Sequence, residues 1–208
     1  MRSIFVTFEG VDGSGKSSQI RTLVALLREM GIPCAVTREP GGSAIGEAIR
    51  SILLDPANSE MTLNTEVLLY CASRAQLVHE VITPALREGK VVICERYADS
   101  TVAYQCYGGG CDIDTVKRIN AFATGGLEPD LTIVLDVDPA TGAARRSNRL
   151  ADRIEKRTEE YYNRVREGYL AIARENPQRV KVVNASGSVE AVGGEVLRLV
   201  RSVLANSI

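Results

Sequence analysis

Apolar residues along the chain form two alternating kinds of segment. Short, nearly continuous apolar runs bounded by Gly, Pro, Asp or Asn are typical of strands buried on both faces. These runs cover residues 4–8, 35–37, 91–94, 131–137 and 180–183. Between them, apolar residues recur with the period of a helix over residues 16–30, 45–54, 63–88, 113–124, 139–146, 158–175 and 189–204. Alternating strands and helices predict an α/β fold with a mainly parallel, five-stranded sheet.

Composition places the chain among ordinary globular proteins, with 45% hydrophobic and 25% charged residues. A length of 208 residues suits one domain, which we expect to span residues 1–208. The 25 Lys and Arg nearly balance 26 Asp and Glu, so the formal net charge is -1. This balance argues against a protein that coats a nucleic acid polymer and against an acidic disordered protein. Any phosphate chemistry must therefore depend on locally concentrated positive charge.

The sequence shows neither a signal peptide pattern nor an apolar stretch long enough to cross a membrane, so we expect a cytoplasmic protein without a membrane partner. Five cysteines form no Cys-x-x-Cys pair, and the single histidine is His79. A tetrahedral Cys/His metal site is not expected, and reduced thiols fit the cytoplasm. Two adjacent glycines, Gly193 and Gly194, interrupt the last helical segment and indicate a kink or close packing.

A phosphate-binding loop directly follows the first expected strand. Residues 10–17 read GVDGSGKS, which fits the pattern G-x-x-x-x-G-K-[ST] at a strand-to-helix junction. The glycines let backbone N–H groups turn toward an anion, and the following helix begins with its positive dipole end at the same point. In such loops the lysine reaches the β- and γ-phosphates and the serine hydroxyl can bind Mg²⁺. The expected ATP-binding residues are Gly10, Asp12, Gly13, Ser14, Gly15, Lys16, Ser17 and Ser18.

This loop predicts a P-loop NTPase fold with three layers, but does not define the reaction. A GTPase would show an Asn-Lys-x-Asp guanine reader, which is absent, and a motor or transporter ATPase needs far more chain. A small kinase fits the length.

Two further stretches follow expected strands, and a third lies within an expected helix. Residues 37–43 read TREPGGS after the second strand, where open α/β sheets place ligands. Residues 95–105 read ERYADSTVAYQ after the third strand, and residues 70–74 read YCASR within a helix. Together with the phosphate loop, these motifs resemble the thymidylate kinase family over about residues 4–173, and Arg-Glu-Pro-Gly-Gly is the most distinctive of them.

The resemblance implies transfer of the γ-phosphate of ATP to dTMP with Mg²⁺, within a nucleoside monophosphate kinase domain that is typically homodimeric. It places Arg38 and Arg96 on the acceptor phosphate, Arg74 on the thymine edge, and Tyr104 beneath the deoxyribose. Asp12 would approach the 3′-hydroxyl or the water around the metal. The implied acceptor-binding residues are Asp12, Arg38, Glu39, Pro40, Tyr70, Arg74, Arg96, Ser100, Tyr104 and Gln105.

Two positions depart from the family pattern. The family usually has Asp where this chain has Glu95, which we expect to reach Mg²⁺ together with Ser17. It usually stacks thymine on Phe where this chain has Tyr70, whose hydroxyl then needs a partner. Asp136, at the end of the fourth expected strand, competes with Glu95 for the metal. Plainer interpretations are a strand-end ion pair for Glu95 and Arg96, core packing for the tyrosines, and a solvated surface for Arg74.

A basic segment follows the fourth strand. Residues 145–157 carry six basic and two acidic side chains, a local charge of +4. Such a run is often a solvated surface, but it resembles the short helical lid of bacterial thymidylate kinases, here about residues 143–157. In that subgroup the lid supplies the arginine that the phosphate loop lacks, as with Gly13 here. Arg153 is the first candidate for this catalytic role, Arg149 the second, and Arg145 or Arg146 come next; Lys16 and Arg96 complete the expected catalytic set.

The acceptor is a phosphate monoester whose second pKa is about 6, so it needs no general base at neutral pH. Catalysis then depends on positioning and positive charge. Two alternatives stay open: a kinase for another pyrimidine nucleotide, and a nucleotide-binding regulator without turnover.

Overall fold

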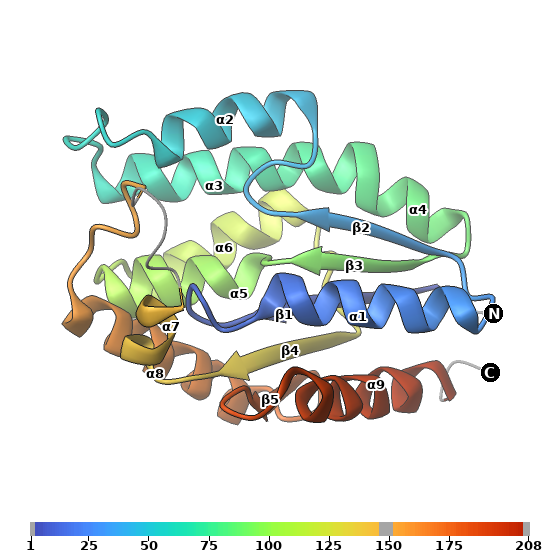
Figure 1. The fold of residues 1–208 in the computed structure, drawn as a ribbon. Helices are drawn as coiled ribbons and strands as arrows, with labels where there is room; N and C mark the ends of the chain where they lie inside the picture. The colour runs from blue at the N-terminus through green and yellow to red at the C-terminus, as the bar shows by residue number, and fades with distance from the viewer. Residues whose placement is uncertain (1–2, 146–151, 206–208) are drawn as a thin grey trace.

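A computed structural model describes residues 3–145 and 152–205 (Figure 1). Five strands form one sheet in the order β2-β3-β1-β4-β5, and every neighbouring pair is parallel. The strands are β1 (Ile4–Glu9), β2 (Cys34–Arg38), β3 (Val91–Glu95), β4 (Leu131–Asp136) and β5 (Val180–Asn184). All five expected strands are therefore present, and within the described residues the sheet is wholly parallel rather than mainly so.

Helices cover both faces of this sheet, so the three-layer prediction is confirmed (Figure 1). Helices α1 and α9 lie side by side on one face, while α4 and α8 pack on the other. Helix α2 packs along α3, which also contacts α6. The helices are α1 (Lys16–Glu29), α2 (Ala44–Leu54), α3 (Leu63–Leu77), α4 (Thr83–Arg87), α5 (Ala98–Thr101), α6 (Ile113–Thr124), α7 (Pro139–Ala144), α8 (Glu159–Glu175) and α9 (Val189–Ala205).

Strand β1 shows why the apolar runs are continuous. All six of its residues are buried, and successive side chains point to opposite faces of the sheet. Ile4, Val6 and Phe8 join the larger core on one face, whereas Phe5 joins a second core that includes Leu77. A strand between two cores has no polar face, which explains the missing alternation.

Two helical segments differ from the sequence-based expectation. Residues 63–88 were expected as one helix, but a π-helical turn, Val78–Ile82, separates α3 from α4. Pro84 accounts for the break, because proline has no N–H to donate and its ring displaces the carbonyl four residues earlier. No helix was expected over residues 98–108, yet α5 continues there into a π-helical segment, Val102–Gly108. Five consecutive residues from Val102 are buried, so the segment carries no helical period to recognise.

The packing of α9 against α1 explains one of the two adjacent glycines in α9. A Cβ added at Gly193 would lie 3.3 Å from Gln19 Oε1 on α1, so α9 packs closely against α1 there. A Cβ at Gly194 would meet nothing within 4 Å, and the structure gives no reason for this glycine. None of the helices in residues 3–145 and 152–205 has the length and hydropathy needed to cross a lipid bilayer.

The carboxyl ends of three neighbouring strands bring the sequence motifs together. In the register of the sheet, Phe8 on β1 and Arg38 on β2 both pair with Glu95 on β3. The phosphate loop, the Arg-Glu-Pro-Gly-Gly segment and the Glu-Arg-Tyr segment therefore leave the sheet at one edge, where open α/β sheets bind ligands.

Candidate active site

The phosphate loop has the backbone that its glycines predict. Gly13 and Gly15 adopt positive φ angles of 80° and 96°. A Cβ at Gly13 would lie 2.1 Å from the carbonyl oxygen of Gly142 on α7, so no larger residue fits there. Gly15 precedes α1 without a side-chain cap, which leaves the first N–H groups of the helix available to an anion.

Lys16 lies inside the loop and is almost completely buried. Its Nζ donates hydrogen bonds to the carbonyl oxygens of Gly10 (3.0 Å) and Val11 (2.9 Å). Burial and, to a smaller extent, the nearby Arg96 guanidinium lower the pKa of Lys16 to about 8. The loop borders a cavity of about 330 Å³, lined by Asp12, Gly13, Gly15, Lys16, Ser17, Ser18, Glu95 and Arg145.

This lowered pKa predicts proton uptake when a nucleoside triphosphate binds. At pH 8 about half of the Lys16 side chains are neutral, because their pKa is about 8. Bound phosphates stabilise the charged ammonium and raise its pKa, so binding should take up about half a proton at pH 8 and nearly one at pH 9. Calorimetry in buffers of different ionisation enthalpy measures this number. The Lys16→Gln variant should show no uptake, and an unaltered protein without uptake at pH 9 would contradict the assignment.

Ser17 and Glu95 meet at one end of the site. Ser17 Oγ donates a hydrogen bond of 2.8 Å to Glu95 Oε2, and Glu95 forms no ion pair with any residue that the structure describes. The competing Asp136 is instead held by Arg166 through two contacts of 2.6 and 2.9 Å. A hydroxyl beside an available carboxylate fits Mg²⁺, which usually takes one or two protein oxygens together with phosphate and water. The donor set therefore favours Ser17 and Glu95 over Asp136.

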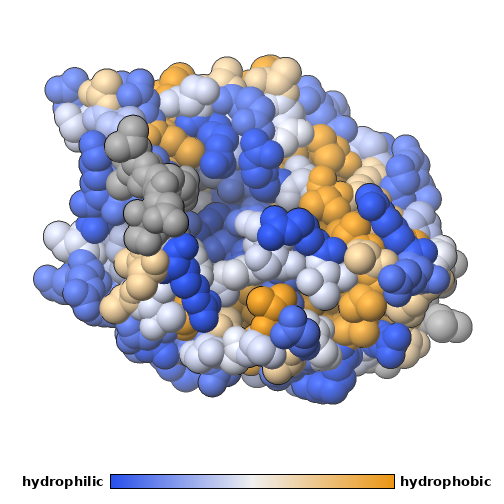
Figure 2. All heavy atoms as spheres, in the orientation of Figure 1, coloured by the Kyte–Doolittle hydropathy of each residue, from blue (hydrophilic) through white to orange (hydrophobic). Residues whose placement is uncertain are grey.

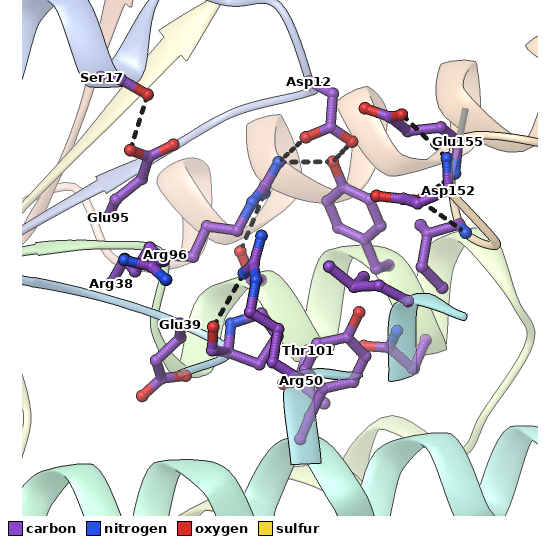
Figure 3. Close-up of a pocket in the computed structure, with 17 residues that line it drawn as sticks. Asp12, Ser17, Arg38, Glu39, Arg50, Glu95, Arg96, Thr101, Asp152 and Glu155 are labelled. Carbon is purple, nitrogen blue, oxygen red and sulfur yellow. Dashed lines mark hydrogen bonds and ion pairs between the residues drawn. The ribbon is translucent and has the colours of Figure 1, made fainter. Parts of the chain in front are cut away.

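A second cavity of about 270 Å³ opens beside the loop (Figure 3). In Figure 3, Ser17 and Glu95 lie at one side, Asp152 and Glu155 at another, and Asp12 and Arg96 between them. Nine of the ten residues expected to bind the acceptor line this cavity: Asp12, Arg38, Glu39, Pro40, Tyr70, Arg96, Ser100, Tyr104 and Gln105. The structure thus brings together segments that are up to about half the chain apart in sequence.

Arg96 is fixed at the centre of this cavity. Its φ angle of 69° makes it the one residue other than glycine with a positive φ in the described chain, a conformation that costs about 1–3 kcal/mol. Its Nη2 donates to Asp12 Oδ1 (2.7 Å) and to the Tyr104 hydroxyl (2.9 Å), while Nη1 donates to Ser100 and Tyr169. A guanidinium held in this way at a strained position indicates a functional group aimed at a ligand.

Arg74 differs from the sequence-based expectation. It does not line the cavity and is only 1% exposed. Its Nε donates to Glu39 Oε2 (2.8 Å), and its Nη1 donates to Thr101 and Asn120. The guanidinium therefore binds protein groups behind the residues that line the cavity. Its partner Thr101, and not Arg74 itself, lines the cavity.

Glu39, the ion-pair partner of Arg74, lines the cavity, and only one of its two carboxylate oxygens is bound to Arg74. Among the described residues its Oε1 is buried without a hydrogen-bond partner. Burial raises the pKa of Glu39 to about 7, although Arg74 acts in the opposite direction. Because buried polar atoms are nearly always paired, this oxygen marks a place where a ligand or water donates a hydrogen bond.

Two arginines border the cavity from the β2–α2 side. Arg38, half exposed, pairs with Glu47 at 2.9 Å in this structure. Arg50, which the sequence analysis missed, lines the cavity and donates a 2.8 Å hydrogen bond to the Pro40 carbonyl oxygen. Its position about two turns into an ordinary amphipathic helix gave no sequence signal.

The basic segment differs most from the expectation. Arg153 lines neither cavity; it is 7% exposed, its Nε donates to the Leu53 carbonyl oxygen (2.8 Å), and its Nη2 lies 2.7 Å from Glu66 Oε2. Arg145, ranked lower from the sequence, instead lines the phosphate-loop cavity. Arg149 and Arg146 lie outside the described residues. Residues 152–157 form turns, so the described part of the expected lid after α7 contains no helix.

Tyr169 on α8 was also missed. Its hydroxyl donates a hydrogen bond to the buried Glu9 carboxylate (2.9 Å) and accepts one from Arg96 Nη1. Tyr169 therefore helps to fix the position of the Arg96 guanidinium. Burial raises the pKa of Glu9, which also accepts hydrogen bonds from Ser100 and the Tyr97 N–H. Tyr169 looks like a core position in the sequence, because a tyrosine in a helical apolar stripe carries no sign of its polar contact.

Comparison with known proteins agrees with this arrangement. The family model described as thymidylate kinase matches residues 8–196. A thymidylate kinase from Symbiobacterium thermophilum is 54% identical over 97% of this chain and 94% of its own, and one from Pelotomaculum thermopropionicum is 50% identical over 98% and 95%. The chain belongs to the thymidylate kinase family.

The family also accounts for the fold. A crystal structure of thymidylate kinase from Ehrlichia chaffeensis superposes with a TM-score of 0.80 at 32% identity, covering 96% of this chain and all of that one. The predicted membership of the thymidylate kinase family, the P-loop NTPase fold and the enzyme class are thereby confirmed. The roles assigned to individual residues of this chain stay predictions.

Proposed function

We propose that this protein transfers the γ-phosphate of ATP to dTMP and releases ADP and dTDP. The observation that carries the proposal is that the two cavities share Asp12, Ser17 and Glu95. One cavity is built from the phosphate loop and the other from the Arg96 side, so a donor phosphate and an acceptor phosphate meet at these shared residues.

On the donor side, the loop N–H groups and Lys16 hold the β- and γ-phosphates. Lys16 leaves its two carbonyl partners for the phosphates, which is favourable because a buried ammonium gains a full anionic partner. Ser17 and Glu95 would hold Mg²⁺ together with the phosphates, and the bound ion would supply further positive charge at the transferred group.

On the acceptor side, Arg96 holds the dTMP phosphate, and Arg38 and Arg50 add positive charge at the cavity rim. An oxygen of this dianionic phosphate forms the new bond to the γ-phosphorus while the bond to the bridging oxygen of ADP breaks. No proton has to be removed from the acceptor, so the residues act by position and charge. Asp12, already bound to Arg96, keeps that guanidinium aligned.

For the nucleoside, we assign the Tyr70 ring to the thymine face and Tyr104 to the deoxyribose. Tyr104 packs under the Arg96 guanidinium, whose Cζ lies 4.8 Å from the ring centroid, and its hydroxyl also donates to Asp12. This locked ring leaves little room for a 2′-hydroxyl. Arg74 supports the same wall through Glu39 and Thr101.

The arginine that meets the transferred phosphate comes from residues 145–157. Arg145 is the best described candidate, because it lines the phosphate-loop cavity and, among the residues that the structure describes, its guanidinium is bound only to the Ala185 carbonyl oxygen at 3.3–3.4 Å. Arg149 remains a candidate. Arg153 requires its pair with Glu66 to break before it could take this role.

A panel of acceptors tests the function. ADP release with ATP and Mg²⁺ should be fastest with dTMP, slower with dUMP and dCMP, and negligible with dAMP or dGMP. A regulator without turnover would show no acceleration by any monophosphate, and this result would refute the kinase. Preference for a purine would refute the assignment of the base pocket, and preference for dCMP would favour a different pyrimidine kinase.

The proposal includes a homodimer, which the surface of helices α2, α3 and α6 supports. Large apolar side chains are exposed there: Ile45 and Ile52 on α2, Leu68 on α3 and Phe122 on α6. Figure 2 shows exposed apolar atoms along the edge that α2 forms in Figure 1. Such a surface is typical of a protein interface. Sedimentation should give twice the chain mass of 22.5 kDa, and a Leu68→Glu variant should shift toward one chain.

A cytoplasmic location is the last part of the proposal. All five cysteines are free thiols, two of them only partly buried, which suits a reducing compartment.

A further inference from the structure

Glu66 on α3 is a buried carboxylate with no part in the proposed phosphate transfer or nucleoside binding. It is 0% exposed and lines neither cavity. Its two oxygens have different partners: Oε1 accepts a 2.8 Å hydrogen bond from Gln105 Nε2, and Oε2 lies 2.7 Å from Arg153 Nη2 and 3.4 Å from Arg157 Nη2. One side chain therefore joins the base end of the acceptor cavity to the basic segment.

This contact decides which way the Gln105 amide faces. A glutamine side chain offers an NH₂ donor on one side and a carbonyl acceptor on the other. A carboxylate that is paired with arginine only accepts hydrogen bonds, so the NH₂ group must point to Glu66. Gln105 lines the acceptor cavity, and no described residue hydrogen-bonds its Oε1. The group presented to a ligand is therefore an acceptor.

Arg153 keeps Glu66 in the position that this orientation needs. Arg153 is held by the Leu53 carbonyl oxygen through its side chain and by the Leu54 carbonyl oxygen through its backbone N–H. It therefore presents its guanidinium to Glu66 from a fixed position. Breaking a buried ion pair is costly, so the carboxylate is held in place as the acceptor of these contacts.

We propose that Glu66 is a specificity-determining positioning residue: it turns the Gln105 carbonyl toward the base and thereby selects a pyrimidine with an N3–H donor. Thymine and uracil carry this donor, whereas cytosine has a lone pair at N3 that faces the carbonyl oxygen unfavourably. The inference rests on the proposed function, in which the base lies beside Gln105. It adds the residue that separates thymine and uracil from cytosine.

The test is the Glu66→Gln variant, which keeps the size of the side chain but can offer either a donor or an acceptor. Gln105 is then free to turn its NH₂ group toward the cavity. Dissociation constants for dTMP, dUMP and dCMP are measured by calorimetry, with displacement for weak ligands. Binding of dTMP and dUMP should weaken while that of dCMP does not, so the preference for dTMP over dCMP should fall about tenfold, the factor that one hydrogen bond provides.

The matched control is Arg157→Gln, which removes the more exposed of the two ion pairs but keeps the contact between Glu66 and Gln105. Its preference for dTMP over dCMP should equal that of the unaltered protein. If Glu66→Gln does not fold because Arg153 is left unpaired, the double variant Glu66→Gln with Arg153→Met gives the same comparison. A preference that stays within twofold, or affinities for all three ligands that fall in parallel, overturns the proposal.

These outcomes are distinct from a failure of the proposed function. If no monophosphate accelerates ADP release in the unaltered protein, the kinase assignment itself fails. If the unaltered protein prefers dTMP and the Glu66→Gln variant keeps that preference, only the role of Glu66 is refuted.

Discussion

Replacing Lys16 with Met is expected to lower kcat by a factor of about 10²–10³, the usual loss when one preorganised charge at a developing transition state is removed. The side chain is buried in the loop with its Nζ between two carbonyl oxygens, so no other described lysine can take its place. Because the folded protein depresses the pKa of Lys16 to about 8, its charge opposes folding at neutral pH. The variant should therefore keep its free energy of unfolding.

Steady-state kinetics with dTMP, combined with thermal unfolding, checks this prediction. Lys90→Met is the matched control, because Lys90 is 39% exposed and, within the described part of the chain, its ammonium pairs only with Glu88 at the surface. Its turnover should be unchanged. A Lys16→Met variant that retained more than about a tenth of the turnover would show that the loop lysine does not stabilise the transferred phosphate.

Replacing Arg74 with Met is expected to lower the free energy of unfolding by about 3–5 kcal/mol, the cost of leaving one member of a buried ion pair alone. Glu39 would lose the partner that holds its Oε2, while its Oε1 already lacks a hydrogen bond from any residue that the structure describes. Burial raises the pKa of Glu39 to about 7 even with Arg74 present, so without Arg74 it rises further. The folded state then binds a proton that the unfolded state releases, and stability falls as pH rises from about 5 to about 8.

Denaturant unfolding at pH 5 and pH 8 measures this loss and its pH dependence. Adding Glu39→Gln to the variant should restore part of the stability at pH 8, because the lone charge is removed. Arg198→Met is the matched control, since Arg198 is 69% exposed and its surface pair with Glu195 contributes about 0–1 kcal/mol. A loss below about 1 kcal/mol for Arg74→Met, equal at both pH values, would contradict the role of this ion pair.

Most of the fold could be predicted from the sequence because its signals are local. The five apolar runs correspond to the five strands within one or two residues, and the phosphate loop has a pattern in which four of eight positions are fixed. Single glycines were also informative: Gly13 and Gly15 of the phosphate loop have the positive φ angles that the motif predicts. The π-helical segment from Val102 could not be predicted, because residues buried on all sides show no alternation of apolar and polar positions.

The site could be predicted as a set of residues but not as a set of contacts. Arg74 and Arg153 were both assigned to ligands, yet each is buried against a carboxylate, Glu39 and Glu66 respectively. Whether an arginine faces a phosphate or a buried glutamate depends on contacts between distant segments, which no local pattern encodes. Glu66 and Tyr169 were missed for the same reason.

The measurement that tests the central claim most directly is a crystal structure of the protein with ADP, Mg²⁺ and dTMP. The dTMP phosphate should lie within hydrogen-bond distance, about 3 Å, of the Arg96 guanidinium, with the thymine ring against Tyr70 and its N3 facing Gln105. The ADP phosphates should lie at Lys16 in the adjoining cavity. A dTMP molecule bound outside the cavity between Arg96 and Gln105, or bound there with its phosphate away from Arg96, would contradict the account.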